Sequence, residues 1–326
     1  MMRRRDVIKL IGGAAAAWPL APGSAAAQAY PNRPVMLVVP FPPGGGNDAL
    51  ARTAAEGMSK TLGHQVVVDN RGGAGGTVAT RAVAKSVPDG YTILLAYTGT
   101  LAINTTLYPN PGYDPRKDFA PIGLIGSLSS VLVVHPSLPV HSVAELMTFA
   151  KANPGKVNYA FTPGTVGHIT TEAFAKASGI ELTRIPYKGN GPAMADLLGG
   201  HVSMMFLSIL PVIGQIRSGT LRALAVTSAA RSNLLPDVPT VAEAGLPDFS
   251  AVIHYGLVAP AGTPRGIVER LNKELVTTLA ADDLRTRLAS EGAVPLAGTP
   301  EDYAAVIDRE ETRWGALVRE LNLKIE

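Results

Sequence analysis

The 326-residue chain contains no cysteine. It therefore has no disulfide, no thiolate metal ligand, no cysteine nucleophile and no lipid-modified cysteine anchor. Charged residues make up only 17% of the chain. No run of about 18 apolar residues, the length that spans a membrane, follows the first 29 residues. We therefore expect the rest of the chain to be a soluble globular protein.

Several enzyme signatures are also missing. The sequence has no G-x-S-x-G turn for a serine nucleophile, no H-E-x-x-H zinc motif and no P-loop with its lysine. His168 and Glu172 stand four residues apart in a helix-like segment, which is half of a metal site, but no third ligand is in sight. A helix cap or a packed ring is the alternative role for His168. We predict that the protein binds no metal.

The first 29 residues have the pattern of an export signal. "RRRDVIK" is a charged head, "LIGGAAAAWPLA" is a short apolar stretch, and "AAAQA" is an end of small residues. Arg4 and Arg5, followed by a spacer, two apolar residues and Lys9, are typical of the twin-arginine type, with a plain secretory signal as the alternative. We predict cleavage near Ala29.

Removal of this segment would also remove the net charge. The segment holds four basic residues and one acidic residue, a net +3, and the whole chain has a formal net charge of +3. The remaining 297 residues (326 minus 29) are therefore neutral. Because nucleic-acid binding needs a clustered Lys and Arg surface, no nucleic-acid partner is expected.

Alternating strand-like and helix-like segments indicate an α/β fold. Runs such as "PVMLVV", "QVVVDN", "YTILLAY" and "VSMMFL" alternate with segments of helical period, such as "DALARTAAEGMSKTLG" and "HITTEAFAKASG". This pattern predicts parallel sheets with helical crossovers, and the length suffices for two domains. From "GTPRGIVERLNKEL" on, the sequence predicts helical cover with one short apolar run, "AVPLAG".

The stretch "VVPFPPGGGNDALAR", residues 38–52, joins the first predicted strand to the first predicted helix. Gly44, Gly46 and Ala49 spell G-x-G-x-x-A, and the next strand-like run ends in Asp69, where a dinucleotide fold keeps its ribose-binding acid. An exported dinucleotide-dependent oxidoreductase is therefore one hypothesis, and a simple tight turn is another. "PFPP" argues against the dinucleotide, because the fingerprint needs its turn directly after the strand.

Loops rich in glycine and hydroxyl groups follow several predicted strands. They are "PFPPGGGND", "NRGGAGGT", "TGTLAIN", "FTPGTVGH" and "YKGNGPA". Because ligands bind outside the carboxyl ends of strands in open parallel sheets, we expect these loops to face one cleft. Only Arg71 and Lys188 among them are basic. Neutral donors suit the reversible capture of an anion better than catalysis.

Longer blocks carry a family resemblance. They are "VVPFPPGGGNDALAR", "VVDNRGGAGGTVATRAVAKSVPDGYTILLA", "IPYKGNGPAMADLLGGHV", "LRALAVTSAARSNLLPDVPTVAEAG" and "GLVAPAGTPRGIVERLNKEL". In this order they resemble the Bug family, which are periplasmic solute-binding proteins of the tripartite tricarboxylate transporter type. The resemblance covers essentially the whole chain after residue 29.

The resemblance implies a type II-like periplasmic binding protein fold, with two parallel-sheet domains joined by two crossover strands around a ligand cleft. The first domain would be residues 30–131 plus 250–326, and the second would be residues 132–249. The implied protein is a periplasmic monomer without enzyme activity or cofactor. It would capture a small organic acid by domain closure, either a di- or tricarboxylate or an aromatic carboxylate. The implied partners are the membrane permease subunits of the transporter, with a sensor protein as a second candidate.

Carried over by position, the resemblance implies ligand contacts in the first domain. The loop from Phe41 to Asp48 matches an aromatic residue and a P-G-G-x-x-D pattern, where N–H groups at a helix start hold a ligand carboxylate. Asn47 stands where Thr or Ser is more usual. The implied contacts are Phe41, Pro43, Gly44, Gly45, Asn47, Asp48, Thr98 and Thr100.

In the second domain the match is partial. "GTVGH" keeps the family's G-[ST]-x-x-H, but one residue is missing upstream, and Pro163 fixes one φ angle. Leu207 and Ser208 replace an acid and an amide of many relatives, which argues against an amino-acid ligand. His254 stands where tryptophan is usual, and "PYKG" is either cleft wall or a structural turn. The implied contacts are Thr162, Gly164, Thr165, His168, Tyr187 and Ser208.

Overall fold

The computed structural model describes residues 30–44 and 46–324. The predicted export signal and Gly45 lie outside the described residues. From Arg33 onward the chain forms one unit. No helix in the described part of the chain is long and apolar enough to cross a membrane.

The first sheet contains three strands of the N-terminal part and three later strands. These strands are β1 (Val35–Val39), β2 (Val66–Asn70), β3 (Thr92–Tyr97), β4 (Phe119–Val134), β9 (Val252–Pro260) and β10 (Ala293–Pro295). Their order is β2-β1-β3-β9-β4, with β10 beside β4.

The second sheet shares β4 with the first. Its other strands are β5 (Asn158–Phe161), β6 (Thr183–Pro186), β7 (Met204–Ser208) and β8 (Arg222–Val226). The order is β4-β7-β5-β6, and β8 also pairs with β4.

Helices cover both sides of each sheet. The helices of the first sheet are α2 (Gly46–Leu62), η1 (Ala74–Gly76), α3 (Thr77–Ala84), η2 (Gly99–Ile103), α4 (Asn104–Leu107), α9 (Arg265–Ala280), α10 (Asp282–Ser290) and α11 (Pro300–Glu320). Those of the second are α5 (Val143–Ala152), α6 (Val166–Ser178), α7 (Asn190–Leu198), η3 (Leu210–Val212) and α8 (Ile213–Arg217). We call each sheet with its helices the first lobe and the second lobe.

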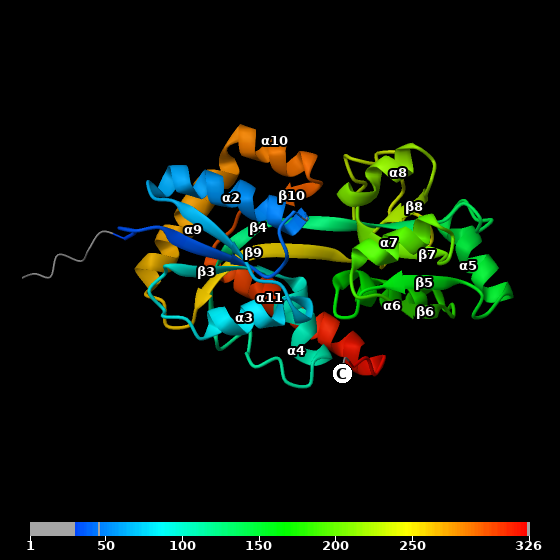
Figure 1. Cartoon of the computed structure of the whole chain (residues 1–326), viewed down its shortest axis with the longest axis horizontal. Helices are drawn as coiled ribbons and strands as arrows, with labels where there is room; N and C mark the ends of the chain where they lie inside the picture. The colour runs from blue at the N-terminus through cyan, green and yellow to red at the C-terminus, as the bar shows by residue number, and fades with distance from the viewer. Residues whose placement is uncertain (1–29, 45, 325–326) are drawn as a thin grey trace, which may run out of the picture. The chain divides into compact units, whose positions relative to one another are not determined.

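Figure 1 shows how the two sheets are covered. In the first lobe, α2, α9 and α10 lie on one side, and α3, α4 and α11 lie on the other. In the second lobe, successive side chains of β7 point to opposite faces of the sheet and pack against different helices. Met205 and Leu207 belong to a buried cluster with Ala193 and Leu197 of α7. Phe206 points the other way and packs edge-on against Phe174 of α6.

The predicted α/β fold is confirmed, and the strand directions add a detail. β1 pairs in parallel with β2 and β3, and β5 pairs in parallel with β6 and β7. The two long strands differ, because β4 and β9 run antiparallel to each other and to their other neighbours. One of them leaves the first lobe and the other returns to it, so they must run in opposite directions. Both sheets are therefore mixed rather than purely parallel.

β4 passes from one sheet to the other. Its residues 119–129 pair with β9, and its residues 130–134 pair with β7. Figure 1 shows β4 and β9 running side by side between the two sets of helices. β4 and β9 are therefore consistent with the two predicted crossover strands between the domains. The domain bounds at 131/132 and 249/250 stay a prediction.

Candidate functional site

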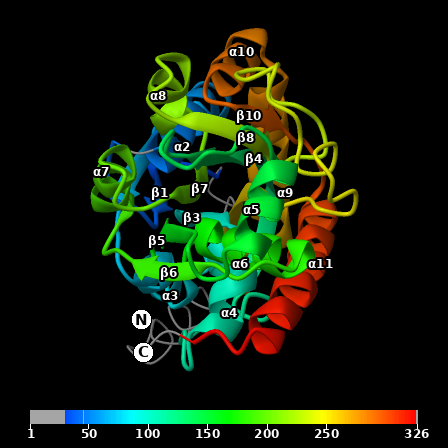
Figure 2. The same ribbon diagram turned by 90° about the vertical axis from the view of Figure 1, so that its right-hand side faces the viewer.

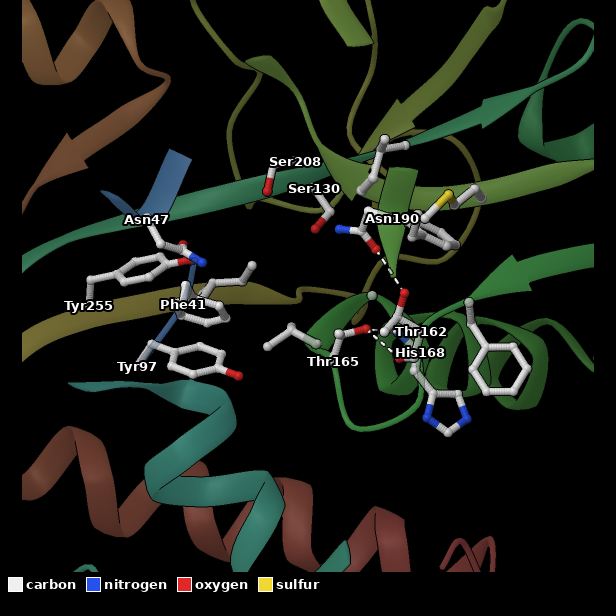
Figure 3. Close-up of a pocket in the computed structure, with 17 residues that line it drawn as sticks. Phe41, Asn47, Tyr97, Ser130, Thr162, Thr165, His168, Asn190, Ser208 and Tyr255 are labelled. Atoms are coloured by element: carbon white, nitrogen blue, oxygen red, sulfur yellow. Dashed lines mark hydrogen bonds between the residues drawn. The ribbon is translucent and has the colours of Figure 1, made fainter. Parts of the chain in front are cut away.

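A cavity of about 100 Å³ lies where the two sheets meet. The first lobe contributes Phe41 from the loop after β1, Asn47 from the first turn of α2, Tyr97 from the end of β3, and Ile253 and Tyr255 from β9. Phe41, Asn47, Tyr97 and Tyr255 form the left wall in Figure 3. All five lie at or near the carboxyl ends of strands or in β9 itself.

The second lobe contributes the opposite wall. Its lining residues are Ser130 of β4, Phe161 and Thr162 at the end of β5, Thr165–His168 at the start of α6, Asn190 at the start of α7, and Met205–Ser208 of β7. The loops predicted to face one cleft therefore meet here in part, namely those after β1, β5 and β6.

Asp48 organises the first loop rather than lining the cavity. Its carboxylate is buried and accepts hydrogen bonds from the Gly44 N–H at 2.8 Å, from Arg52 at 3.0 Å and from Asn70 at 3.0 Å. Burial alone raises the pKa of Asp48, but the hydrogen bonds from Arg52, Gly44 and Asn70 outweigh burial and hold this pKa below its ordinary value. The ionised side chain thus ties the glycine turn to α2 and β2.

We expect Asp48→Ala to lower the free energy of unfolding by about 1–3 kcal/mol, the usual cost of leaving buried partners unpaired. Urea unfolding of both proteins at pH 7 measures this difference. Asp48→Asn is the matched control, because its amide oxygen still accepts from the turn, and it should cost less. An alanine variant as stable as the wild type would show that the loop does not depend on this carboxylate.

Two asparagine side chains, one from each lobe, line the cavity, and in both of them the Oδ1 atom accepts a hydrogen bond from a hydroxyl group of the same lobe. The Tyr255 hydroxyl donates to Asn47 Oδ1 at 2.5 Å, and the Thr162 hydroxyl donates to Asn190 Oδ1 at 3.1 Å. Among the described residues, neither Nδ2 group donates a hydrogen bond. Figure 3 shows the Asn190 nitrogen on the side of Ser130, away from its bond to Thr162. Each lobe therefore offers an NH₂ donor to the cavity.

Three helices begin at the cavity. α2 starts next to Asn47, α6 starts after Thr165, and α7 starts at Asn190. Thr165 is the N-cap of α6, because its hydroxyl accepts from the His168 N–H at 3.4 Å. Helix starts carry partial positive charge and free N–H groups, so all three favour an anion in this cavity.

Gly167 lets α6 approach β7 closely. A Cβ at this position would lie 2.6 Å from the Phe206 carbonyl oxygen, which is backbone and cannot move aside cheaply. Any side chain here would push the start of α6 away from the sheet. The glycine therefore fixes the distance between α6 and the second-lobe wall of the cavity.

The cavity carries no formal charge among its described lining residues. None of them is Asp, Glu, Lys or Arg. His168 is the described lining residue whose side chain ordinarily titrates closest to neutral pH. Burial lowers the pKa of His168 to about 4, and this effect outweighs the nearby Glu172 carboxylate, which acts to raise the pKa. The imidazole is therefore neutral at pH 7. The loop composition predicted a cleft with few formal charges, and the lining agrees, because Arg71 and Lys188 of those loops are not part of it.

Aromatic rings form the apolar part of the cavity. Phe41 and Tyr97 lie with ring centroids 4.9 Å apart, and Tyr97 stacks on Tyr255 at 6.0 Å. The Tyr97 hydroxyl donates to the Gly75 carbonyl at 3.0 Å, which fixes the ring. These rings give the carbon body of a ligand a flat apolar surface.

Six of the predicted contact residues line this cavity: Phe41, Asn47, Thr162, Thr165, His168 and Ser208. Their role as ligand contacts stays a prediction. The imidazole of His168 stacks on Phe161 at 4.3 Å, and Figure 3 shows it turned away from the labelled donors. This geometry agrees with the alternative role considered for His168 from the sequence, namely a packed ring.

The other predicted residues that the structure describes lie outside the lining, and most have structural partners. Thr98 Oγ1 accepts from the His254 N–H, and the Thr100 hydroxyl donates to the Tyr97 carbonyl. The Tyr187 hydroxyl donates to Asp196 at 2.6 Å, which favours the structural alternative for "PYKG". The remaining members are Pro43 and Gly44, which are exposed in the first loop, Gly164, which has φ +78° in the turn before α6, and Gly45, which lies outside the described residues.

Sequence reasoning did not single out Tyr97, Ser130, Asn190 and Tyr255. Asn190 carries a signal, because it stands in the glycine-rich "YKGNGPA". The other three lie inside apolar runs, where strand alternation alone does not say which face meets a ligand. His254 lies on the opposite face of β9 from Tyr255, 3.8 Å from Glu310, and it does not line the cavity.

The dinucleotide hypothesis finds little support in the geometry. The cavity beside α2 is small against the roughly 300–1,000 Å³ of pockets for drug-sized ligands, at about 100 Å³. Asp69 forms an ion pair with Arg71 at 2.7 Å and does not line the cavity. In the described ranges no three His, Cys, Asp or Glu residues gather into a metal site.

The chain matches the family model described as "Tripartite tricarboxylate transporter family receptor" over residues 50–323. It is 41% identical to Protein BugT of Bordetella pertussis over 302 residues, which are 92% of this chain and 93% of BugT.

Solved structures show the same fold. The periplasmic binding protein BugD is 40% identical with a TM-score of 0.80, over 91% of this chain and 100% of BugD. R. palustris Rpa4515, solved with adipate, is 38% identical with a TM-score of 0.82, over 89% of this chain and 97% of its own. MatC from Rhodopseudomonas palustris, with bound malate, is 34% identical with a TM-score of 0.79, over 89% and 100%.

Proposed function

This chain belongs to the receptor family of the tripartite tricarboxylate transporters, as its sequence blocks predicted, and on that premise we propose that it captures a small organic carboxylate by closing its two lobes. The role of the family is solute binding. One observation carries the proposal: donors from both lobes meet in one uncharged cavity. BugD is a periplasmic binding protein of the same fold, and Rpa4515 and MatC, which also share this fold, were solved with the dicarboxylates adipate and malate.

The electrostatics of the cavity explain why a carboxylate suits it. Three helix starts and the two amide NH₂ groups of Asn47 and Asn190 all present hydrogen-bond donors. Such donors stabilise an anion without a salt bridge. A neutral cavity also releases its ligand more readily than one with a buried Arg or Lys, which suits a delivery protein.

The same wall disfavours an ammonium group. Leu207 and Ser208 lie in the lining, and no carboxylate is found among the described lining residues to pair with a cation. Amino acids should therefore bind more weakly than acids of the same size. The aromatic wall of Phe41, Tyr97 and Tyr255 suits a short aliphatic or aromatic body.

In this proposal β4 and β9 act as the hinge. Ligand first contacts the first-lobe loop, and rotation about the two strands brings up Thr165 and Asn190. Closure is favoured only by contacts that the ligand makes better in the closed state. No covalent bond is made or broken. The closed form would then be recognised by the permease subunits in the membrane or by a sensor protein.

The proposed location is the periplasm. The export-type N-terminal pattern and the periplasmic relative BugD support it. The domain bounds at 131/132 and 249/250 complete the proposal, because β4 and β9 cross between the lobes near them.

A thermal-shift screen tests the function directly. The purified protein is heated with C4 and C6 dicarboxylates, tricarboxylates, aromatic acids, amino acids and NAD(P)(H). A ligand at 100 times its dissociation constant adds about 2.7 kcal/mol of stability. We expect stabilisation by one class of carboxylic acids and none by nucleotides or amino acids. Stabilisation by a nucleotide alone would overturn the proposal in favour of the dinucleotide hypothesis.

A further inference from the structure

The C-terminal half of α11 belongs to the first lobe but lies against the second. Trp314 and Val318 are buried, and α11 packs on β4, η2, α4 and α9. Past this anchor, Lys176 of α6 forms an ion pair with Glu320 in the last turn of α11. Figure 2 shows α11 passing beside α6.

α11 also touches the strand that returns to the first lobe. Arg313 donates to the Ser250 carbonyl just before β9 begins. Glu310 accepts from Trp314 at 2.8 Å and lies 3.8 Å from His254 of β9. One rigid helix therefore spans the distance from the hinge strand to α6.

The contact between α11 and the second lobe is loosely packed. A groove of about 590 Å³ separates Ala173 and Ala177 of α6 from Ala316 and Leu317 of α11. A second groove, of about 490 Å³, lies between Leu321 and residues of α6 and β6. Both grooves are open at the surface, so the two helices share no closely packed core at this contact, in contrast to the buried core beneath each helix. The contact can therefore separate more easily than that core.

α6 transmits its position to the ligand cavity. Inside the second lobe, Glu172 is buried and accepts from Arg184 at 2.6 and 2.7 Å and from the Tyr159 hydroxyl, which holds α6 to β5 and β6. Lys176 lies ten residues after Val166, roughly 15 Å along the helix. A tie at Lys176 therefore acts on the same rigid body that carries the cavity-lining start of α6.

We propose that Lys176 and Glu320 are positioning residues that latch α6 to α11 and hold the two lobes in the arrangement that completes the ligand cavity. The pair joins the lobes in the conformation where Asn47 and Asn190 line one cavity. A contact made in the binding-competent state raises its population, and apparent affinity follows that population. This inference rests on the proposed function.

The test measures affinity and dissociation rate for the acid that the thermal-shift screen identifies. Lys176→Met and Glu320→Gln should each raise Kd about three- to five-fold, the effect of an exposed pair worth up to about 1 kcal/mol. The increase should appear mainly as faster dissociation. The double variant Lys176→Glu with Glu320→Lys restores an ion pair of reversed polarity and should return Kd to within about two-fold of wild type. If the single variants weakened binding through misfolding or through loss of another side-chain contact, the double variant would not restore it.

Salt and a control pair separate the latch from general charge effects. Because exposed ion pairs are screened, the wild-type advantage over both variants should vanish at about 1 M salt. Arg265 and Glu269 form another exposed ion pair, which lies within α9 of the first lobe alone. Glu269→Gln should therefore leave Kd unchanged.

The outcomes distinguish the two claims. If the wild type binds an acid and the Lys176 and Glu320 variants bind it equally well, the latch is wrong and the proposed function stands. The latch is also wrong if both single variants weaken binding but the swap does not restore it. If the wild type binds none of the acids, the proposed function itself fails.

Discussion

Asn47→Asp and Asn190→Asp are each expected to weaken the binding of a carboxylate ligand by about 1,000-fold. Aspartate keeps the size of the side chain and still accepts from the Tyr255 or Thr162 hydroxyl. Only the NH₂ group that faces the cavity changes, into an oxygen with negative charge. Two like charges about 4 Å apart repel by about 4 kcal/mol at an effective dielectric of about 20, which is about three powers of ten in Kd.

Isothermal titration with the acid identified by the screen measures both variants. Asn233→Asp is the control, because Asn233 is exposed in the second lobe and does not line the cavity, and its Kd should not change. Asn47→Leu and Asn190→Leu remove the donor without adding charge and should cost less, about ten-fold. Unchanged binding by the aspartate variants would mean that the ligand carboxylates lie elsewhere.

Acidification from pH 6.5 to pH 4 is expected to cost the wild-type protein about 3 kcal/mol of folding stability through His168 alone. The side chain is buried, and Nδ1 has no hydrogen-bond partner. Burial lowers the pKa of His168 from 6.5 to about 4. Below pH 6.5 the unfolded chain therefore binds a proton that the folded protein rejects, and this favours unfolding until about pH 4. A difference of two to three pKa units corresponds to about 3 kcal/mol.

Urea unfolding at pH 7 and pH 4.5 tests this expectation in the wild type and in His168→Phe. Phenylalanine keeps the stack on Phe161 and leaves no buried nitrogen without a partner. The variant should lose less stability on acidification. The pKa of Glu172 stays below its ordinary value despite burial, because Arg184 and Tyr159 donate hydrogen bonds to its carboxylate. The stability that Glu172 contributes is therefore lost only below about pH 4.5, and this loss is the same in both proteins. Equal losses in the two proteins would show that His168 is not buried in its neutral form.

Local sequence patterns were enough to predict many of the strands and helices, because these depend on neighbours along the chain, but the run that forms β9 was not among the predicted strands. β-branched runs such as "PVMLVV" form β1, and Thr299 followed by a proline caps α11 with a complete capping box. The glycine-rich loop between β1 and α2 was also correctly located. Its inner arrangement was less predictable, since Asp48 turns inward to bind Gly44 and Asn70 instead of facing a ligand.

The sequence by itself determined the fold class, the family and the donor-rich, charge-poor character of the strand-end loops. Only the tertiary structure decided which donors share one cavity. Asn47 and Asn190 are 143 positions apart, and their common orientation depends on hydroxyl partners, Tyr255 and Thr162, that no local pattern links to them. The direction of β4 and β9 and the pairing of Lys176 with Glu320 likewise follow from how distant segments pack. Such contacts depend on three-dimensional distance, whereas periodicity and motifs report only the chemistry of near neighbours.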